Sequence, residues 1–323
     1  MKIIVTGGAG YIGSHTLKIL NNNGHETLTI DNLSTGHKKF VKWGEFEKAD
    51  ICELDKLKII FRKFKADAVI HFAASSIVSE SFNDPIKILK NNIYGSLNVL
   101  EAMKASKINN IVFSSTCSIY GLPKSNPINE DMTKNPISPY GESKLIVENF
   151  LNWFDKAGLI KYISLRYFNA AGADPDGELG EEHIPETHLI PSILDTALGF
   201  RPFFEIYGTK FSTHDGTCIR DYIHVTDIAR AHVLALEKLL NGTTSTCLNL
   251  GTGQGYSVME IINAVKKTLK VEFEVIERKA RPGDVAELVA NSDKIRKSLN
   301  WDSKYSDLDT IVKTAYAWKK INQ

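Results

Sequence analysis

Two side chains that could move a proton, Tyr140 and Lys144, stand four residues apart in the sequence. This spacing puts both on one face of a helix that Ser138 and Pro139 can start. A phenol with a reference pKa of about 10 is a poor base at neutral pH. A neighbouring ammonium favours the phenolate, so the pair could take a proton from a substrate hydroxyl.

The spacing alone is weak support for this role. The chain has three Tyr-x-x-x-Lys matches, and about one is expected by chance. A glycine and a proline interrupt the match at Tyr120, and the match at Tyr316 lies in the last expected helix. Only Tyr140 follows the fourth expected strand, whose hydroxyl-rich end carries Thr116. The alternative for Tyr140 is a surface residue with an ordinary contact along the helix.

A glycine-rich loop near the N-terminus could hold a dinucleotide. Gly7, Gly10 and Gly13 lie between an apolar run and a helical pattern, where glycine lets the backbone approach a pyrophosphate. Turns collect glycine anyway, so the loop needs context. Asp31 lies 18 residues after Gly13, at the end of the next expected strand. Its carboxylate can bind ribose hydroxyls and would repel a 2′-phosphate, which favours NAD over NADP. Otherwise Asp31 is a solvated loop residue.

Short β-branched runs alternate with longer helical patterns through the first two thirds of the chain. The expected strands are residues 2–6, 26–30, 67–71, 110–114 and 161–165. The expected helices are residues 11–23, 54–64, 85–105 and 139–156. Because this alternation builds parallel strands with helical crossovers, the fold class is α/β, a doubly wound parallel sheet of the Rossmann type.

A loop rich in glycine, proline and aspartate at residues 172–180 breaks this rhythm. We expect an NAD-binding domain over residues 1–171 and a second, smaller domain over residues 172–323. Later helices are expected at 186–198, at 226–240 and after Tyr256 and Ser306, with strands at 204–207 and 247–250. Segments 219–225 and 246–251 are expected to return to the first sheet, which would make the second domain discontinuous.

Composition excludes several classes of function. The 323 residues carry 39 Lys and Arg against 38 Asp and Glu, so no basic surface for nucleic acid or an acidic membrane is expected. No apolar run is long enough to span a bilayer, and the N-terminus lacks a signal-peptide core. The four cysteines are far apart, which favours the reducing cytoplasm. No metal is expected, since the nine histidines show no ligand spacing joined to carboxylates or cysteines.

The glycine loop, the hydroxyl cluster and Tyr140 with Lys144 together resemble the extended short-chain dehydrogenase/reductase superfamily, and within it the UDP-glucose 4-epimerases. The resemblance runs almost from end to end. Its specific runs are Gly10-Tyr11-Ile12-Gly13-Ser14-His15-Thr16, Asp31-Asn32-Leu33-Ser34, His71-Phe72-Ala73-Ala74, Leu165-Arg166-Tyr167-Phe168-Asn169, Arg220-Asp221-Tyr222-Ile223-His224-Val225, Asn249-Leu250-Gly251 and Arg281-Pro282-Gly283-Asp284.

This resemblance implies that the catalytic residues are Tyr140, Lys144 and Thr116. It implies that NAD is lined by Gly7, Gly10, Tyr11, Ile12, Gly13, Asp31, Asn32, Asp50, Ile51, Phe72, Ala73, Asn91, Lys144 and Phe168. It places the UDP-sugar against Thr116, Tyr140, Asn169, His188, Leu189, Arg220, Arg281, Asp284 and Leu288. It also implies a homodimer. Taken alone, Arg220 could equally form a surface ion pair with Asp221.

Some residues depart from the family pattern. Thr116 stands where some members have serine, and Ser76 stands where some have a lysine near the nicotinamide. His188 stands where others have an asparagine against the substrate; read alone, it is a surface residue of a helix. Leu288 occupies the position whose size helps decide whether an N-acetyl group at C2 of the sugar fits, unless it merely packs in the second domain.

The activity that the resemblance implies is inversion of C4 of a UDP-hexose, UDP-glucose or UDP-galactose, through a 4-keto intermediate. Preference for another UDP-sugar, such as UDP-N-acetylglucosamine, is one alternative. A nucleotide-sugar 4,6-dehydratase or decarboxylase shares the first oxidation, but dehydratases place acidic residues directly after the threonine, where this chain has Cys117 and Ser118. A non-catalytic NAD-binding regulator would not need Tyr140, Lys144 and Thr116 together.

Overall fold

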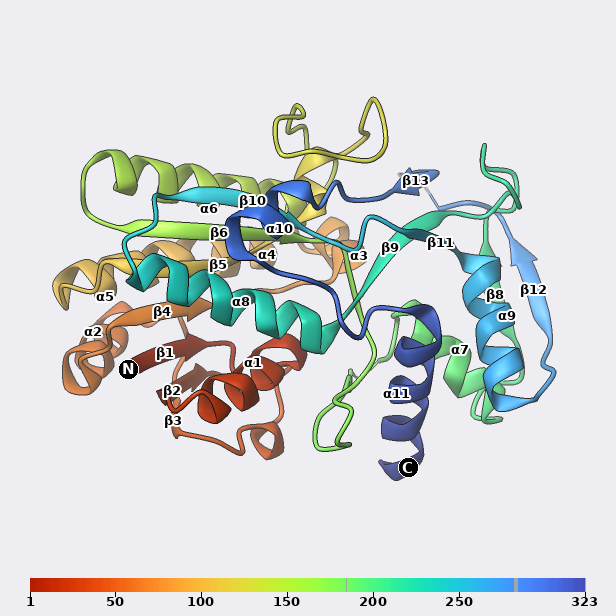
Figure 1. Ribbon diagram of the computed structural model, residues 1–323, viewed down its shortest axis with the longest axis horizontal. Helices are drawn as coiled ribbons and strands as arrows, with labels where there is room; N and C mark the ends of the chain where they lie inside the picture. The colour runs from red at the N-terminus through yellow and green to blue at the C-terminus, as the bar shows by residue number, and fades with distance from the viewer. Residues whose placement is uncertain (184, 282–283, 323) are drawn as a thin grey trace.

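The computed structural model describes residues 1–183, 185–281 and 284–322, and a seven-stranded parallel sheet forms its larger part (Figure 1). The strand order is β10-β6-β5-β4-β1-β2-β3. The strands are β1 (Lys2–Thr6), β2 (Glu26–Asp31), β3 (Glu45–Lys48), β4 (Ala68–His71), β5 (Asn110–Thr116), β6 (Lys161–Tyr167) and β10 (Thr246–Leu250). Because β1 and β4 are neighbours while β2 lies on the other side of β1, the order reverses there, which is where such sheets bind ligands.

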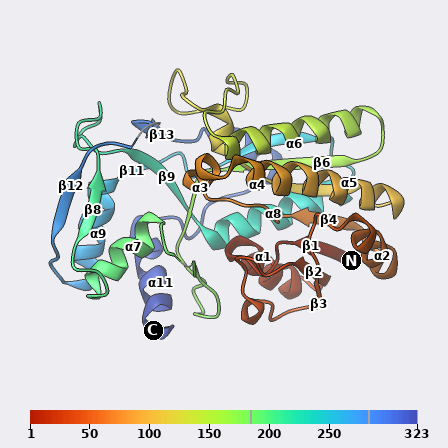
Figure 2. The same ribbon diagram turned by 180° about the vertical axis from the view of Figure 1, so that it is seen from behind.

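Helices cover both faces of this sheet. Helices α1 (Tyr11–Asn22) and α8 (Val225–Leu240) lie on one face, and α2 (Leu54–Phe64), α5 (Gly95–Ala105) and α6 (Pro139–Lys156) lie on the other (Figures 1 and 2). Side chains of β1 alternate between the two cores: Ile3 and Val5 pack with α1 and α8, and Ile4 packs with α2 and α5. The expected doubly wound α/β class is confirmed.

The rest of the chain builds a smaller unit. Strand β9 (Ile219–His224) pairs with β7 (Asn169–Ala171), β11 (Gly255–Ser257) and β13 (Glu287–Leu288), and β8 (Phe204–Tyr207) pairs with β12 (Val275–Arg278). Helices α7 (Leu189–Ala197), α9 (Val258–Leu269) and α11 (Leu308–Ile321) enclose a separate apolar core that includes Ile193, Ile261 and Ile311.

One expected sheet connection is wrong. Strand β10 takes the edge of the large sheet beside β6, but segment 219–225 does not join that sheet. Its strand β9 is held in the small sheet because the carboxylate of Asp221, within β9, accepts hydrogen bonds from Thr252, Gly253 and Ala290. Each of these contacts draws β9 toward β11 and β13.

Several boundaries also differ from expectation. The helix expected at 186–198 begins at Leu189, because His188 is extended and precedes the first turn. The helix expected at 85–105 is divided into α4 (Pro85–Leu89), a π-helical turn (Lys90–Tyr94) and α5. Elements that were not expected are β3, β7, β11, β12, β13, α3 (Val78–Asn83), α10 (Asp293–Leu299) and the 3₁₀ turns Lys38–Phe40 and Cys117–Tyr120. Among the described residues, no helix is both long and apolar enough to cross a bilayer.

Candidate active site

The glycine turn between β1 and α1 is shaped for close approach of another molecule. Gly7 has a φ of +75°, and a Cβ there would lie 2.5 Å from the nitrogen of Ala73. A Cβ on Gly13 would overlap the carbonyl oxygen of Gly7, whereas at Gly10 its nearest neighbour would be 3.4 Å away. Gly10 caps α1 without a side chain, so the first N–H groups of the helix remain available to an anion.

The ends of β2 and β3 gather the acidic residues named from the sequence. Asp31 is 9% exposed and accepts hydrogen bonds from the backbone nitrogens of Ala9 at 3.0 Å and Leu33 at 2.8 Å. Burial raises the pKa of its carboxyl group, while the two backbone hydrogen bonds act in the opposite direction. The amide of Asn32 donates to Asp50 at 2.8 Å. These contacts fix the carboxylate and amide groups at the carboxyl ends of β2 and β3.

The loop after β4 begins at the carboxyl edge of the large sheet, as the glycine turn does. The nitrogens of Phe72 and Ala73 both donate to the carbonyl of Thr6, at 2.9 and 3.1 Å, which ties this loop to the glycine turn. Asn91, in the π-helical turn, donates a hydrogen bond to the hydroxyl of Ser75 at 3.4 Å. Ser76 is exposed.

The proton-transfer candidates come from β5 and from the start of α6. The hydroxyl of Ser138 caps α6 by accepting a hydrogen bond from Gly141 at 3.1 Å, and the proline after Ser138 occupies the first turn. Tyr140 and Lys144 therefore lie one helical turn apart, and both are buried. Thr116, the last residue of β5, is also buried, and its hydroxyl accepts a hydrogen bond from Ser118 at 3.1 Å.

Burial opposes charge on both members of the Tyr140 and Lys144 pair. It raises the pKa of the Tyr140 phenol; Tyr167 raises that pKa further, and hydrogen bonding with Thr116 lowers it. Burial also lowers the pKa of Lys144 to about 7. Burial therefore opposes the help that Lys144 was expected to give the phenolate, and a further positive charge is needed to ionise Tyr140 at neutral pH.

Three of the substrate-binding candidates, Asn169, Arg220 and Leu288, lie on strands of the small sheet. Asn169 in β7 is in register with Tyr222 in β9, and Leu288 in β13 is in register with Arg220. The Arg220 guanidinium donates to the carbonyl of Ile219 at 2.8 Å. Over residues 1–183, 185–281 and 284–322, no carboxylate pairs with Arg220. The alternative of an ion pair with Asp221 is wrong, because that carboxylate is buried against backbone N–H groups.

Two further candidates lie after β12. The guanidinium of Arg281 stacks over the ring of Tyr207 at 3.9 Å, and its backbone nitrogen donates to the carboxylate of Asp284 at 3.3 Å. Both Arg220 and Asp284 lie close enough to Cys218 to affect the pKa of its thiol, which burial raises. Pro282 and Gly283, between these candidates, lie outside the described residues.

Leu288 contacts a small apolar cluster that follows Thr116 in the chain. This cluster consists of Cys117, Ile119, Tyr120, Ile128, Phe168 and Ala290. Because this cluster includes residues that directly follow β5 and precede β7, Leu288 packs against segments next to the large sheet as well as against the second unit.

His188 does not lie free on a helix surface. Its Nδ1 atom is 3.0 Å from a carboxylate oxygen of Glu181 and 3.1 Å from one of Glu186. Although burial lowers the pKa of this imidazole, the two carboxylates outweigh burial and raise it to about 10. No ligand spacing that joins histidines to carboxylates was expected, but the structure brings His183 and His188 together with Glu181 and Glu186.

Sequence reasoning missed residues that position the candidates. Asn92 accepts a hydrogen bond from the nitrogen of Ser75 at 2.8 Å and donates to the hydroxyl of Ser143 at 3.0 Å, which joins the loop after β4 to α6. Ser114 contacts the hydroxyl of Tyr167 and offers its carbonyl to Lys144 at 2.9 Å. The residue types at the ends of β5 and β6 were the only signal for Ser114 and Tyr167.

Comparison with known proteins finds similar chains of one family. Residues 3–251 match the NAD dependent epimerase/dehydratase family. A UDP-glucose 4-epimerase of Rhizobium leguminosarum bv. trifolii is 48% identical over 322 residues, 99% of this chain and 98% of that protein. UDP-glucose 4-epimerase from Brucella ovis in complex with NAD is 47% identical, with a TM-score of 0.95 over 98% of this chain and 97% of that one. The UDP-Glc/GlcNAc 4-epimerase from Campylobacter jejuni is 40% identical, with a TM-score of 0.87 over 99% of both chains.

Proposed function

The chain belongs to the NAD dependent epimerase/dehydratase family, and we propose that the side chains at the carboxyl edge of its large sheet perform the C4 inversion of a UDP-hexose. The chain is an NAD-dependent isomerase of UDP-hexoses. The observation that supports the assignment of roles is that α6 packs against β5, so that Tyr140 hydrogen-bonds with Thr116 and Lys144 donates to the carbonyl of Ser114 at 2.9 Å.

The described residues fit NAD. The crowded glycine turn leaves room only for backbone, and Asp31 faces the place of a ribose at the end of β2. We assign the cofactor contacts to Gly7, Gly10, Tyr11, Ile12, Gly13, Asp31, Asn32, Asp50, Ile51, Phe72, Ala73, Asn91, Lys144 and Phe168. When bound, NAD supplies the hydride acceptor for C4, a positive charge beside Tyr140, and the hydride that returns to C4.

The substrate is bound mainly through its UDP moiety. Arginine guanidinium groups bind phosphate oxygens in pairs and stay charged, and Arg220 has no carboxylate partner in the described part of the chain. We assign the contacts that bind the substrate in this way to Asn169, His188, Leu189, Arg220, Arg281 and Asp284. Binding energy from UDP orients the hexose without holding both of its faces equally.

Tyr140 is the base of the first half reaction. It takes the proton from the 4-hydroxyl while Thr116 hydrogen-bonds to the same oxygen, and a 4-keto sugar results. The ketone then presents its other face, which requires a loosely held hexose on a firmly held UDP. Tyr140 returns its proton to the oxygen, and C4 has the opposite configuration.

The other activities considered are less well supported. A 4,6-dehydratase needs acid and base groups for C5 and C6, and Cys117 and Ser118 occupy the positions after Thr116. Burial raises the pKa of the Cys117 thiol to about 12, so it supplies no thiolate at neutral pH. A non-catalytic NAD-binding regulator would have no need of three side chains that can exchange or hydrogen-bond protons, Tyr140, Lys144 and Thr116, close together.

The decisive experiment incubates the purified protein with UDP-galactose and no added cofactor, and follows the products by NMR. UDP-glucose should accumulate until the two sugars reach equilibrium. A 4-keto-6-deoxy sugar as the product would replace epimerisation by dehydration, and no turnover by a folded, NAD-loaded protein would overturn the proposed function.

Finer properties of the molecule are also proposed. Residues 1–171 serve mainly NAD and residues 172–323 mainly the UDP-sugar. A homodimer is supported by large apolar side chains exposed on neighbouring helices, Val78, Phe82, Ile86, Tyr94 and Leu97; sedimentation of an Ile86→Glu variant tests it. A cytoplasmic location is supported by the four cysteines, all of which are free thiols.

A further inference from the structure

Four side chains with metal-ligand chemistry meet in the loop that joins β7 to α7. Glu181, His183, Glu186 and His188 each offer one nitrogen or oxygen atom, and these atoms all lie within 4.8 Å of one another. The Nδ1 atom of His188 lies 3.0 Å from Glu181 and 3.1 Å from Glu186, and that of His183 lies 3.3 Å and 3.8 Å from the same two carboxylates.

These separations match the edges of a small coordination tetrahedron. With ligand distances of about 2.0–2.1 Å, the edge of a tetrahedral zinc site is about 3.3 Å. The measured separations of 3.0–3.8 Å lie on both sides of that value. Two imidazole nitrogens and two carboxylate oxygens suit zinc and neighbouring first-row divalent ions better than calcium or magnesium, which prefer oxygen alone.

The two carboxylate side chains are mostly buried, His183 is partly buried, and His188 is exposed. The side chains of Glu181 and Glu186 are each 8% exposed. The Nδ1 atom of His183 is buried, and within the described ranges it makes no hydrogen bond, although it faces both carboxylates. A buried nitrogen with no hydrogen bond is costly unless another ligand satisfies it.

A second group of acidic residues in the same loop shows the contrast. Asp174, Asp176 and Glu178 also lie close together, but the ammonium of Lys18 is 2.8 Å, 2.7 Å and 2.7 Å from them. The ammonium of Lys18 therefore already pairs with all three carboxylates of this group. Over the described ranges, no lysine or arginine forms an ion pair with Glu181 or Glu186, and the basic groups beside their carboxylates are the two imidazoles.

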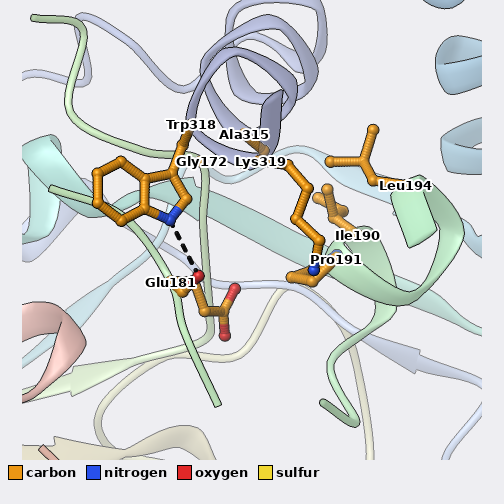
Figure 3. Close-up of a pocket in the computed structure, with 8 residues that line it drawn as sticks. All are labelled: Gly172, Glu181, Ile190, Pro191, Leu194, Ala315, Trp318 and Lys319. Carbon is orange, nitrogen blue, oxygen red and sulfur yellow. Dashed lines mark hydrogen bonds between the residues drawn. The ribbon is translucent and has the colours of Figure 1, made fainter. Parts of the chain in front are cut away.

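Contacts with two neighbouring segments anchor the loop that carries these four side chains. The indole nitrogen of Trp318 in α11 donates to the carbonyl of Glu181 at 3.2 Å (Figure 3). The neighbouring Glu182 pairs with Lys39 at 2.7 Å. The ligand loop is therefore anchored on one side by the last helix and on the other by the segment that follows β2.

We propose that Glu181, His183, Glu186 and His188 bind one divalent transition-metal ion, with Zn²⁺ as the best match to the ligand set. Because the chain supplies four ligands, the site is closed, and the ion is structural rather than catalytic. It fixes the loop that ends in His188 and Leu189; this consequence for the sugar site rests on the proposed function, whereas metal binding does not.

The test uses the full-length protein after dialysis against a chelator, titrated with Co²⁺ as a visible probe and then with Zn²⁺. We expect saturation at one ion per chain, with the visible absorption of tetrahedral cobalt that Zn²⁺ removes, and a higher melting temperature. His183→Gln should weaken binding at least about tenfold, because a donor is lost. The matched control is His214→Gln, since His214 also lies near two carboxylates, at 3.6 and 3.7 Å, but is exposed.

Binding by His214→Gln should equal that of the unaltered protein. Circular dichroism checks that His183→Gln is folded; if it is not, His183→Cys, which keeps a metal-binding side chain, should restore both folding and cobalt binding. Absence of saturable binding by the unaltered protein, or equal binding by folded His183→Gln, overturns the site. These readouts do not depend on UDP-sugar turnover, so failure of the metal site and failure of the epimerase assignment are distinguishable.

Discussion

The ammonium of Lys144 lies 6.0 Å from the centre of the Tyr140 ring and donates its hydrogen bond to the carbonyl of Ser114, 2.9 Å away. The hydrogen bond of Lys144 thus goes to the backbone, and any help that Lys144 gives the phenolate must come through its charge. Burial weakens that charge by lowering the pKa of Lys144 to about 7. The ionisation of Tyr140 thus depends on a second positive group, which the proposed mechanism assigns to bound NAD.

Replacing Tyr140 with Phe removes the proposed base with little change in packing. We expect kcat to fall by about 10²- to 10⁴-fold, as is typical for loss of one positioned proton-transfer group, and Thr116→Val to lower kcat as well. Tyr316→Phe is the matched control, because Tyr316 has the same spacing to a lysine in α11. Full turnover by a folded Tyr140→Phe protein would remove Tyr140 from the mechanism.

The purified protein should retain NAD, because the hydride returns to the same substrate and the cofactor has no need to leave. Denaturing the protein and assaying the supernatant for nucleotide measures this retention. Asp31→Ala should lower the NAD content, since it removes the carboxylate at the end of β2. An NAD-free protein whose activity requires freely exchanging cofactor would contradict the proposed cycle.

The buried Lys144 makes stability depend on pH in a defined direction. In the unfolded chain its pKa is about 10.4, and in the folded protein about 7. Between these values the unfolded state binds more protons, so this lysine's destabilising effect is complete below pH 7 and fades as the pH rises toward about 10. In NAD-free protein, Lys144→Met should therefore be more stable than the unaltered chain near pH 6, by a few kcal/mol at about 1.4 kcal/mol per pKa unit.

Urea unfolding of both proteins from about pH 6 to pH 10 measures this difference, and Lys156→Met controls for removing a lysine from the same helix. The advantage of Lys144→Met must shrink with rising pH. An advantage that grows instead would show that Lys144 is not the group with the lowered pKa.

Leu288 should influence which sugar is accepted. Leucine is bulkier than serine and offers no hydrogen bond to an amide, but it leaves more room than tyrosine, and apolar pockets discriminate single groups by about 1–3 kcal/mol. We expect UDP-glucose and UDP-galactose to be the main pair, with weak turnover of UDP-N-acetylglucosamine. Leu288→Ser should raise, and Leu288→Tyr lower, kcat/KM for the N-acetylated sugar relative to UDP-glucose. Equal ratios in all three proteins would remove Leu288 from the site.

The parts of the fold that follow from local pattern could be predicted from the sequence. Helix α2 matches the expected residues 54–64, and the expected strand at 2–6 matches β1, because burial on one or both faces imposes a clear period. Strand β3 was missed because Glu45–Lys48 reads Glu-Phe-Glu-Lys and is only half buried at its centre. The π-helical turn at Lys90–Tyr94 was missed because its hydrogen bonding leaves the overall helical pattern intact.

Some residues of the candidate site could likewise be identified from the sequence, and others could not. Tyr140 and Lys144 could be paired from the sequence because one helix carries both. Asn92 and Tyr167 could not, since their contacts with Ser75, Ser143 and Ser114 form only when separate elements pack together. The Glu181 group lies in a loop without a regular period, so its spacing carries no signal until the backbone path is known.

The hydroxyl of Tyr11, the first residue of the helix after the glycine turn, donates a hydrogen bond to the carbonyl of Gly172 at 2.5 Å. Gly172 opens the segment that leads to His188 and Leu189, so one contact joins the nucleotide helix to the sugar-side loop. A ligand that orders this loop would therefore also act on the helix after the glycine turn, and thermodynamic reciprocity requires the two ligands to change each other's affinity by the same factor. We accordingly expect the protein to bind NAD more tightly when UDP occupies the substrate site than when that site is empty.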